Sequence, residues 1–273
     1  FLTVLEDRLQ KLKGNSFEVI KAGTPGVGPQ TYLSILKQEG IKYNPDLVLV
    51  NIFVGNDIFD IKLPSNSSEN NHSLNESENK ITYTNKNINS VKPQKQKSTT
   101  ALKDFLRRNL HLYSFVVDRL KNIPFIRHFL QKNNIASGLI GSYVIDILKK
   151  EYSDEYKAKW NEMFCTLTQM KEISDNLIVV IIPTREQVDS VRLEKALKQL
   201  DYKKDDIDIY HPNNLIKDYC TSNNILCIDM LPIFKQSTDQ PLYFEIDPHF
   251  NTEGHKLAAN TIFNELIANK IIN

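Results

Sequence analysis

The chain has 273 residues, 41% of them hydrophobic, which is enough to bury one sizeable core with room for an insertion. Its 34 Lys and Arg residues nearly cancel its 33 Asp and Glu residues, so no net field favours nucleic acid as a partner. No apolar run approaches the roughly 18 residues of a membrane-spanning helix, and the three cysteines provide neither a disulfide framework nor a metal-binding knuckle.

The N-terminal part of the chain predicts a helix, a strand and a glycine-containing loop. Leucines recur at helical spacing over residues 2–12. A strand-like stretch follows at residues 17–22, and the loop Gly23-Thr24-Pro25-Gly26-Val27-Gly28 then precedes a helical pattern at 32–36. Glycines let the backbone turn sharply and bring its N–H groups close to a ligand. Alone this loop is a weak signal, because neither G-x-G-x-x-G nor G-K-[ST] is present.

The next informative stretch is a continuous apolar run, residues 47–54, that ends at Gly55-Asn56-Asp57. Such a run is typical of a strand buried on both faces in a parallel sheet. Polar groups just past the carboxyl end of such a strand lie where open α/β sheets bind their ligands. The uncharged amide of Asn56 is suited to donate a hydrogen bond to a developing oxyanion. The alternative is that Asn56 and Asp57 only close the turn.

A change of composition follows this strand. Residues 63–100 are rich in Asn, Ser, Lys and Glu and have almost no apolar periodicity, so we expect a disordered or mobile loop. Residues 101–135 regain helical spacing and predict a helical insertion. We expect this insertion to form a cap beside the active-site face that selects the substrate. The alternative is an amphipathic hairpin that only shields the core.

The second half of the chain alternates helices and strands, which predicts a parallel, doubly wound sheet with right-handed crossovers. The segment Thr184-Arg185-Glu186-Gln187 directly follows one of these strands and should lie on the same rim as Asn56. Arg185 is a candidate for binding an acidic group of a substrate, and a solvated arginine is the alternative. The expected elements are helices over 152–174, 191–200 and 215–223, and strands over 177–183 and 225–229.

The C-terminal block Asp247-Pro248-His249 places a carboxylate two residues before a histidine. A neutral imidazole held by a carboxylate can accept a proton from a nucleophile near pH 7 and return it to the leaving group. Asn251 or Thr252 can cap the helix expected over residues 254–269. The alternative role of His249 is to cap that helix.

In this order and separation the three blocks resemble those of the SGNH (GDSL-type) hydrolase family along nearly the whole chain. The resemblance implies a three-layer α/β/α, flavodoxin-like fold and the hydrolysis or transfer of ester groups through a serine nucleophile. Residue by residue, it implies that the Gly26 N–H and Asn56 form the oxyanion hole. It also implies that His249 is the base and Asp247 its carboxylate partner, with Gly55 and Asp57 supporting the turn.

The chain departs from the family pattern in two places. No Gly-Asp-Ser, the family's nucleophile block, occurs in these 273 residues. Our interpretation is that the sequence is a fragment without its first strand and its serine. The family spacing is Asp-x-x-His, whereas one residue separates Asp247 from His249 here, so Glu245 is an alternative partner.

We therefore expect an ester hydrolase or an O-acyl (acetyl) transferase that acts on a small-molecule or carbohydrate ester and needs no cofactor or metal. One alternative is a non-catalytic binding module that retains the fold without the nucleophile. Another is a metal-dependent phosphatase using Asp57, Asp60, His249 and His255. The two histidines lack a common ligand spacing, which argues against that phosphatase.

Overall fold

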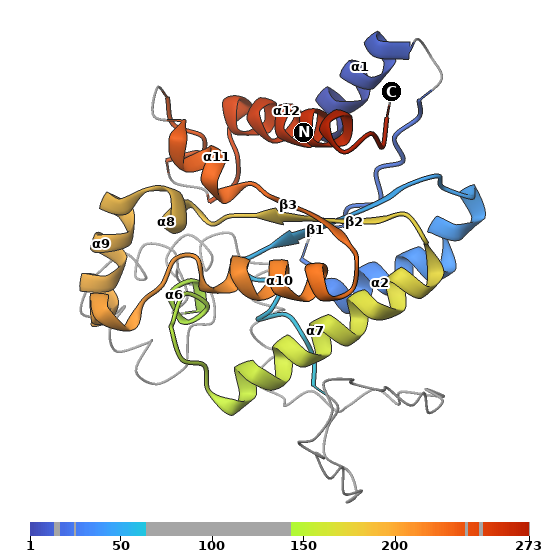
Figure 1. Ribbon diagram of the computed structural model, residues 1–273. Helices are drawn as coiled ribbons and strands as arrows, with labels where there is room; N and C mark the ends of the chain where they lie inside the picture. Colours follow the sequence, from blue (N-terminus) through green and yellow to red (C-terminus); the bar gives the residue numbers. More distant parts are fainter. Residues whose placement is uncertain (14–16, 25, 64–142, 238–239, 246–247, 273) are drawn as a thin grey trace, which may run out of the picture. The chain divides into compact units, whose positions relative to one another are not determined.

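Three parallel strands in the order β1-β2-β3 form the centre of the computed structural model (Figure 1). The structure describes residues 1–13, 17–24, 26–63, 143–237, 240–245 and 248–272, all within one compact unit. In the sheet, Val48 lies opposite Leu177, and Ile178 lies opposite Leu226. The strands are β1 (Val48–Phe53), β2 (Leu177–Ile182) and β3 (Leu226–Asp229).

The described residues form α-helices of very different lengths together with two short 3-10 helices. In chain order they are α1 (Leu2–Lys13), α2 (Pro29–Gln38), η2 (Gly40–Tyr43), α6 (Tyr143–Asp146), α7 (Asp154–Ile173), α8 (Arg185–Val188), α9 (Ser190–Leu200), η3 (Lys204–Asp206), α10 (His211–Ser222), α11 (Leu231–Gln236) and α12 (Thr252–Ala268). The expected mixed α/β architecture with a parallel sheet is confirmed.

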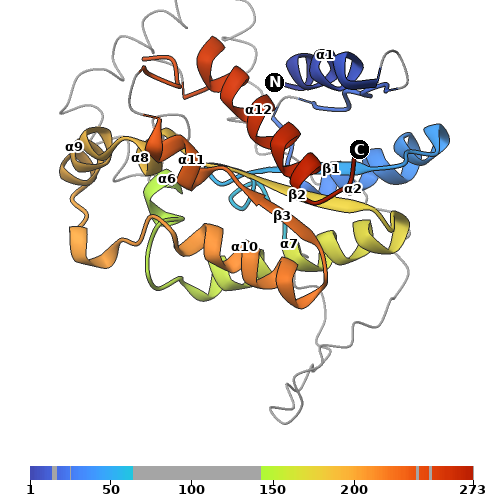
Figure 2. The same cartoon turned by 45° about the horizontal axis from the view of Figure 1, so that its top comes forward.

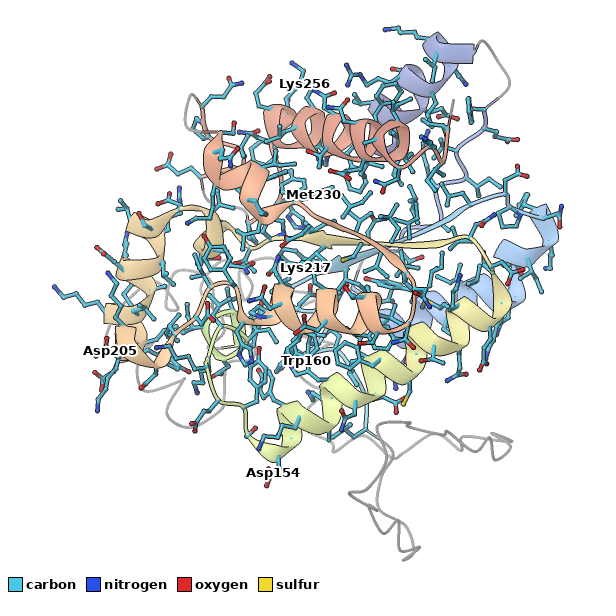
Figure 3. All side chains as sticks on the ribbon, viewed as in Figure 1. Asp154, Trp160, Asp205, Lys217, Met230 and Lys256 are labelled. Atoms are coloured by element: carbon cyan, nitrogen blue, oxygen red, sulfur yellow. The ribbon has the colours of Figure 1, made fainter. Side chains whose placement is uncertain are left out.

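Helices cover both faces of the sheet (Figures 1 and 2). Side chains alternate between the two faces of a strand, so β2 contributes Val179 to one core and Val180 to the other. Helices α2, α7 and α10 supply the first core, and α1, α11 and α12 supply the second. Figure 3 shows Trp160 in the layer of α7 and α10, and Met230 between β3 and α12.

The helix starts follow from residues that satisfy or remove free N–H groups in the first turn. The side chains of Ser153, Asp189 and Asn251 accept hydrogen bonds from first-turn N–H groups of α7, α9 and α12. Pro29 and Pro212 lie in the first turns of α2 and α10, where a missing N–H costs nothing. The expected cap at Asn251 is therefore confirmed.

The strand expected at residues 17–22 is wrong, because this stretch has no assigned secondary structure. The Val19 N–H donates to the Glu6 carboxylate of α1 at 3.1 Å instead of joining the sheet. Val48 and Val54 direct their N–H groups to the β2 side, so Leu49 and Asn51 between them direct theirs away from β2. In the described sheet β1 is thus an edge strand, and residues 17–22 do not pair with it.

Several sequence expectations fall on residues that the structure does not describe. They are the loop at 63–100 beyond Leu63, the helical insertion at 101–135, and the carboxylate of Asp247. Among the helices that are described, none combines the length and the apolar character that a membrane span requires.

A short hairpin before α12 holds the segment that carries His249. Tyr243 and Phe250 form an antiparallel bridge, and Asn251 donates its backbone N–H to the Leu242 carbonyl at 3.0 Å. The Asn251 side chain also donates to the Pro241 carbonyl at 2.6 Å. A Cβ atom at Gly254 would lie 2.1 Å from the Leu242 oxygen, so only glycine lets α12 approach the hairpin this closely.

We therefore predict that Gly254→Ala destabilises the protein, although alanine normally favours a helix interior by up to about 1 kcal/mol. Overpacking against the Leu242 carbonyl should lower the free energy of unfolding by about 1–3 kcal/mol, measured by urea denaturation. Gly23→Ala is the matched control, because a Cβ atom there has no neighbour within 4 Å. Equal or higher stability of the Gly254 variant would contradict the close contact.

Candidate functional site

The turn after β1 is held by the buried carboxylate of Asp57, which is 2% exposed. Its Oδ2 accepts the Phe53 N–H at 2.9 Å, and its Oδ1 accepts the Tyr32 hydroxyl at 3.1 Å. The Asp57 N–H in turn donates to the Phe53 carbonyl at 3.2 Å. Asp57 thus closes the backbone turn that presents Asn56 and ties it to α2.

The environment of Asp57 favours its protonated form. Burial raises the pKa of Asp57 to about 7, and the negative charge of Asp60 acts in the same direction. The hydrogen bonds from the Phe53 N–H and the Tyr32 hydroxyl oppose this rise without cancelling it. Burial, followed by the charge of Asp57, also raises the pKa of Tyr32.

Asn56 lies directly before Asp57 and is half-buried. Its amide nitrogen donates to the Asp60 Oδ2 at 2.8 Å, and its carbonyl oxygen on the main chain accepts the Asp60 N–H at 2.8 Å. An amide NH2 group carries two protons, so this bond orients the group and leaves the second proton for another acceptor.

The glycine loop approaches this turn through Gly28. A Cβ atom at Gly28 would lie 3.1 Å from the Asp60 Cβ and 3.4 Å from the Asp57 carbonyl oxygen. Gly26, two residues earlier, is exposed and has a φ of +72°, a left-handed conformation that glycine adopts most readily. The sequence assigned the ligand-binding role to Gly26, and the close contact with the turn is made by Gly28.

The segment after β2 forms the short helix α8, whose polar side chains are buried. Thr184 and Gln187 make a reciprocal capping box, which explains why a helix starts at Arg185, directly after Thr184. The Arg185 Nε donates to the Glu186 carboxylate at 3.1 Å, and both side chains are almost fully buried. The expectation that this segment follows β2 at the sheet edge is confirmed, whereas Arg185 is a buried residue rather than a solvated one.

The hairpin that carries His249 packs against the same segment. The Arg185 guanidinium donates to the Glu245 carbonyl at 3.1 Å, and the Tyr243 hydroxyl donates to the Pro183 carbonyl at 2.8 Å. Burial and then the negative charge of Glu186 raise the pKa of Tyr243. These contacts fix the base of the hairpin on the residues that follow β2.

His249 itself lies at the exposed end of the hairpin, where its carbonyl accepts the Phe244 N–H at 3.0 Å. Burial lowers the pKa of His255 on α12, and the charge of His249 acts in the same direction. The Phe1 amino group lies 2.9 Å from the His255 Nδ1.

The three sequence blocks are therefore linked by a series of contacts at the carboxyl edge of the sheet. Gly28 meets the turn at Asp57 and Asp60, and a Cβ atom at Gly55 in that turn would lie 3.2 Å from the Thr184 side chain. Pro183 and Arg185 then hold the hairpin of His249. The Asn56 side chain contacts Asp60.

The sequence assigned no role to four of the residues that shape this edge. Tyr32 reaches Asp57 from α2, and the buried charge of Glu186 acts on two tyrosines, Tyr143 and Tyr243. Burial and the charges of Asp60 and Glu186 raise the pKa of Tyr143. Its ring stacks on Phe59 of the turn after β1, with centroids 5.0 Å apart. Only the three-dimensional contacts could reveal these partners, because they lie far apart in the chain.

The residues of the phosphatase alternative, Asp57, Asp60, His249 and His255, do not form a metal-binding group in the described structure. No set of three or more His, Cys, Asp or Glu side chains among the described residues is arranged to hold a metal ion. Asp57 is instead engaged by Phe53 and Tyr32, and Asp60 by Asn56.

Comparisons of the chain with models of protein families, with curated proteins and with solved structures return no match. They therefore do not test the motif resemblance. Function is inferred from the motifs and from the geometry at this edge of the sheet.

The raised pKa of Asp57 predicts an unusual pH dependence of stability. Between about pH 4, where an ordinary carboxyl group ionises, and pH 7 the folded protein retains a proton that the unfolded chain releases. The free energy of unfolding should therefore fall as pH rises through this window, by at most about 1.4 kcal/mol per pH unit. Asp57→Asn should remove this dependence, because a side-chain amide does not titrate. The turn should persist, since the amide can still accept from Phe53 and donate to Tyr32.

Urea denaturation of both proteins between pH 4 and pH 8 measures this difference, with the exposed Asp218→Asn as the control. We expect wild type to lose stability relative to the Asp57 variant up to about pH 7 and then to level off. A difference that is constant, or that favours wild type as pH rises, would show that Asp57 is ionised in the folded protein at lower pH.

Proposed function

We propose that this protein is an SGNH-type (GDSL) ester hydrolase or O-acyl transferase with a flavodoxin-like α/β/α fold. In this proposal it acts through an acyl-serine on a small-molecule or carbohydrate ester. The sheet with helices on both faces is compatible with that fold. The chemistry is proposed from the motif residues, and the proposal places the serine in a segment outside these 273 residues.

One observation carries the proposal: the turn of Asn56 and the hairpin of His249 both pack against residues 183–186. Thr184 lies against Gly55, while Pro183 and Arg185 bond to Tyr243 and Glu245. Two motifs that are almost 200 residues apart in sequence, at positions 56 and 249, are thus anchored on one short segment at the carboxyl edge of the sheet.

In the proposed mechanism, His249 accepts the proton of the serine hydroxyl as the oxygen attacks the ester carbonyl. Asp247 holds the imidazole tautomer and stabilises its charged form. The tetrahedral oxyanion accepts hydrogen bonds from Asn56 and from the Gly26 N–H. His249 then returns the proton to the departing alcohol, and water or a second alcohol releases the acyl group.

Asn56 is suited to this role because its amide nitrogen already donates one proton to the Asp60 carboxylate, with the nitrogen 2.8 Å from Oδ2. A donor that is oriented before the substrate binds loses little free energy when charge develops on the oxyanion. Asp57 acts as a positioning residue, since it closes the turn on which Asn56 sits.

One further feature of the described sheet agrees with a serine carried by an additional strand. The edge of β1 that faces away from β2 presents the backbone of Leu49 and Asn51, which a parallel strand could pair with.

A non-catalytic binding module is the second candidate, and one observation favours it. The Gly-Asp-Ser block does not occur in the 273 residues. A protein that retained the sheet and the site geometry without a nucleophile would bind an ester or sugar and leave it intact.

A serine-directed fluorophosphonate applied to the longer native protein separates the two candidates. Covalent labelling of a single serine, located by mass spectrometry and abolished in His249→Ala, is the result that we expect. The exposed Asn214→Ala, which lies outside the motif residues, should label like wild type. A folded protein that remains unlabelled would contradict the enzyme and support the binding module.

The role of Asn56 predicts the effect of Asn56→Ala in the longer protein. Loss of one oxyanion donor costs on the order of 3 kcal/mol of transition-state stabilisation, so kcat on an activated acetyl ester should fall roughly a hundredfold or more. KM should change much less, because the donor acts mainly on the transition state. The exposed Asn214→Ala is the control. Wild-type turnover in the Asn56 variant, with fluorophosphonate labelling intact, would remove Asn56 from the mechanism while leaving the enzyme class standing.

A further inference from the structure

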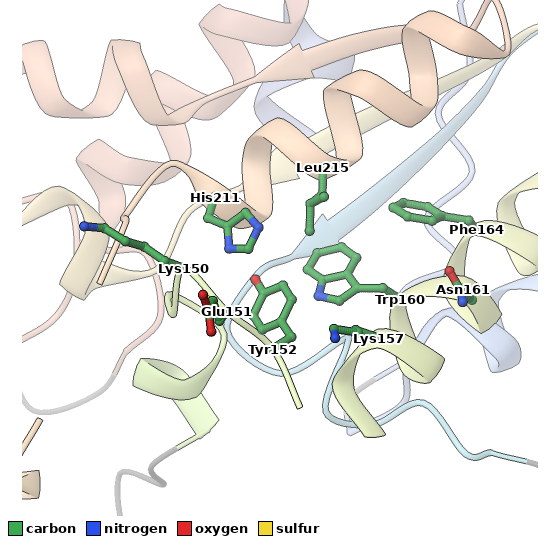
Figure 4. A pocket seen from close by; sticks show the side chains of 9 residues that line it. All are labelled: Lys150, Glu151, Tyr152, Lys157, Trp160, Asn161, Phe164, His211 and Leu215. Atoms are coloured by element: carbon green, nitrogen blue, oxygen red, sulfur yellow. The ribbon is translucent and has the colours of Figure 1, made fainter. Parts of the chain in front are cut away.

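A cavity of about 400 Å³ lies between the start of α7 and the start of α10 (Figure 4). This volume is within the range of about 300–1,000 Å³ that small-molecule sites occupy. Its walls include Tyr152, Trp160, Phe164, His211 and Leu215. None of the residues assigned to ester chemistry lines it, so the cavity is separate from the proposed catalytic site.

The aromatic walls of the cavity are fixed in place by their contacts. The Tyr152 ring stacks on His211 with centroids 4.7 Å apart, and Phe164 stacks on Tyr219 at 4.6 Å. His211 donates through its Nδ1 to the Lys149 carbonyl, because a carbonyl can only accept. The Tyr152 hydroxyl donates to the Ile147 carbonyl at 2.6 Å. A rigid apolar wall of this kind loses little conformational entropy when a ligand binds.

Trp160 brings an unused donor to this wall. The residue is 3% exposed, and its indole N–H is buried without a hydrogen-bond partner among the described residues. Burial raises the pKa of the Tyr152 hydroxyl, and the nearby Trp160 indole opposes this rise. The indole N–H and the hydroxyl nevertheless do not meet the geometry of a hydrogen bond. In Figure 4 the indole nitrogen is on the side of the ring toward Tyr152 and Lys157. A buried donor without a partner is costly, and a ligand acceptor would remove that cost.

The rim of the cavity is polar and carries charges of both signs. It includes the exposed side chains of Lys150, Glu151, Lys157 and Asn161. Together they offer ammonium and amide donors with carboxylate and amide acceptors. This mixture does not favour an ion of either sign. It matches a neutral ring that has apolar faces and hydroxyl groups around its edge.

We propose that this cavity binds a neutral sugar of one or two rings. The apolar faces of the sugar would lie against the wall formed by Tyr152, Phe164 and Leu215. Its hydroxyl groups would bond to the rim residues Lys157 and Asn161, and one oxygen would accept the Trp160 N–H. This site is a binding site, and it does not depend on the ester chemistry proposed above.

The single tryptophan of the chain, Trp160, gives a direct measurement. Its fluorescence is recorded while the protein is titrated with methyl glucoside, methyl galactoside, N-acetylglucosamine and cellobiose, and with benzoate as a planar anion. We expect a saturable change with at least one sugar, complete by about 10 mM if Kd is near 1 mM. No saturable change with any sugar, or saturation with benzoate alone, would overturn the proposal.

Variants of the rim then locate the binding site. Lys157→Ala and Asn161→Ala should each weaken sugar binding about three- to tenfold, because each removes hydrogen bonds to the ligand. Trp160→Phe keeps an aromatic wall without the N–H, and calorimetry should show a similar loss. Lys171→Ala, on α7 but outside the cavity, is the matched control. Sugar binding that survives both rim changes in folded protein would overturn the assignment to this cavity. Because the readout is binding, it does not depend on whether the protein hydrolyses esters.

Discussion

The arrangement of the candidate site depends on how residues 183–186 pack at the carboxyl end of β2. Thr184 caps α8 and lies against Gly55 of the neighbouring turn, while Arg185 and Pro183 bond to the hairpin. A parallel sheet brings the carboxyl ends of its strands to one edge. This short segment therefore sets where the turn of Asn56 and the hairpin of His249 can lie.

Buried polar groups make this edge rigid at a cost in stability. Asp57 lies inside the protein with a raised pKa, and the ion pair of Arg185 and Glu186 is almost fully buried. A buried ion pair contributes little net stability, because desolvation offsets its attraction. Buried polar groups do, however, restrict the backbone to one arrangement when every hydrogen bond is satisfied. Such preorganised groups are typical of sites that must hold donors in place before a reaction.

Long, strongly patterned elements were predictable from the sequence, and the contacts between them were not. The apolar runs of β1 and β2 and the Asn251 cap of α12 follow from local rules of burial and capping. The expected strand at residues 17–22 failed because a strand requires a neighbour, and local pattern does not supply one. Likewise, the contact of Gly28 with Asp60 and the hydrogen bond from Tyr32 to Asp57 depend on long-range packing. The role of His249 rests on its motif, since Asp247 lies outside the described residues.

The proposed function requires the side chains of residues 56 and 249 to lie close together, and a thiol cross-linking measurement tests this requirement most directly. Asn56→Cys and His249→Cys are combined in a protein whose native Cys165, Cys220 and Cys227 are replaced by serine or alanine. A short bifunctional thiol reagent should bridge this pair rapidly in the folded state. A control pair of Asn56→Cys with Ile267→Cys, near the far end of α12, should not be bridged. Bridging of the 56 and 249 pair that is no faster than the control would place the two groups apart and contradict the account.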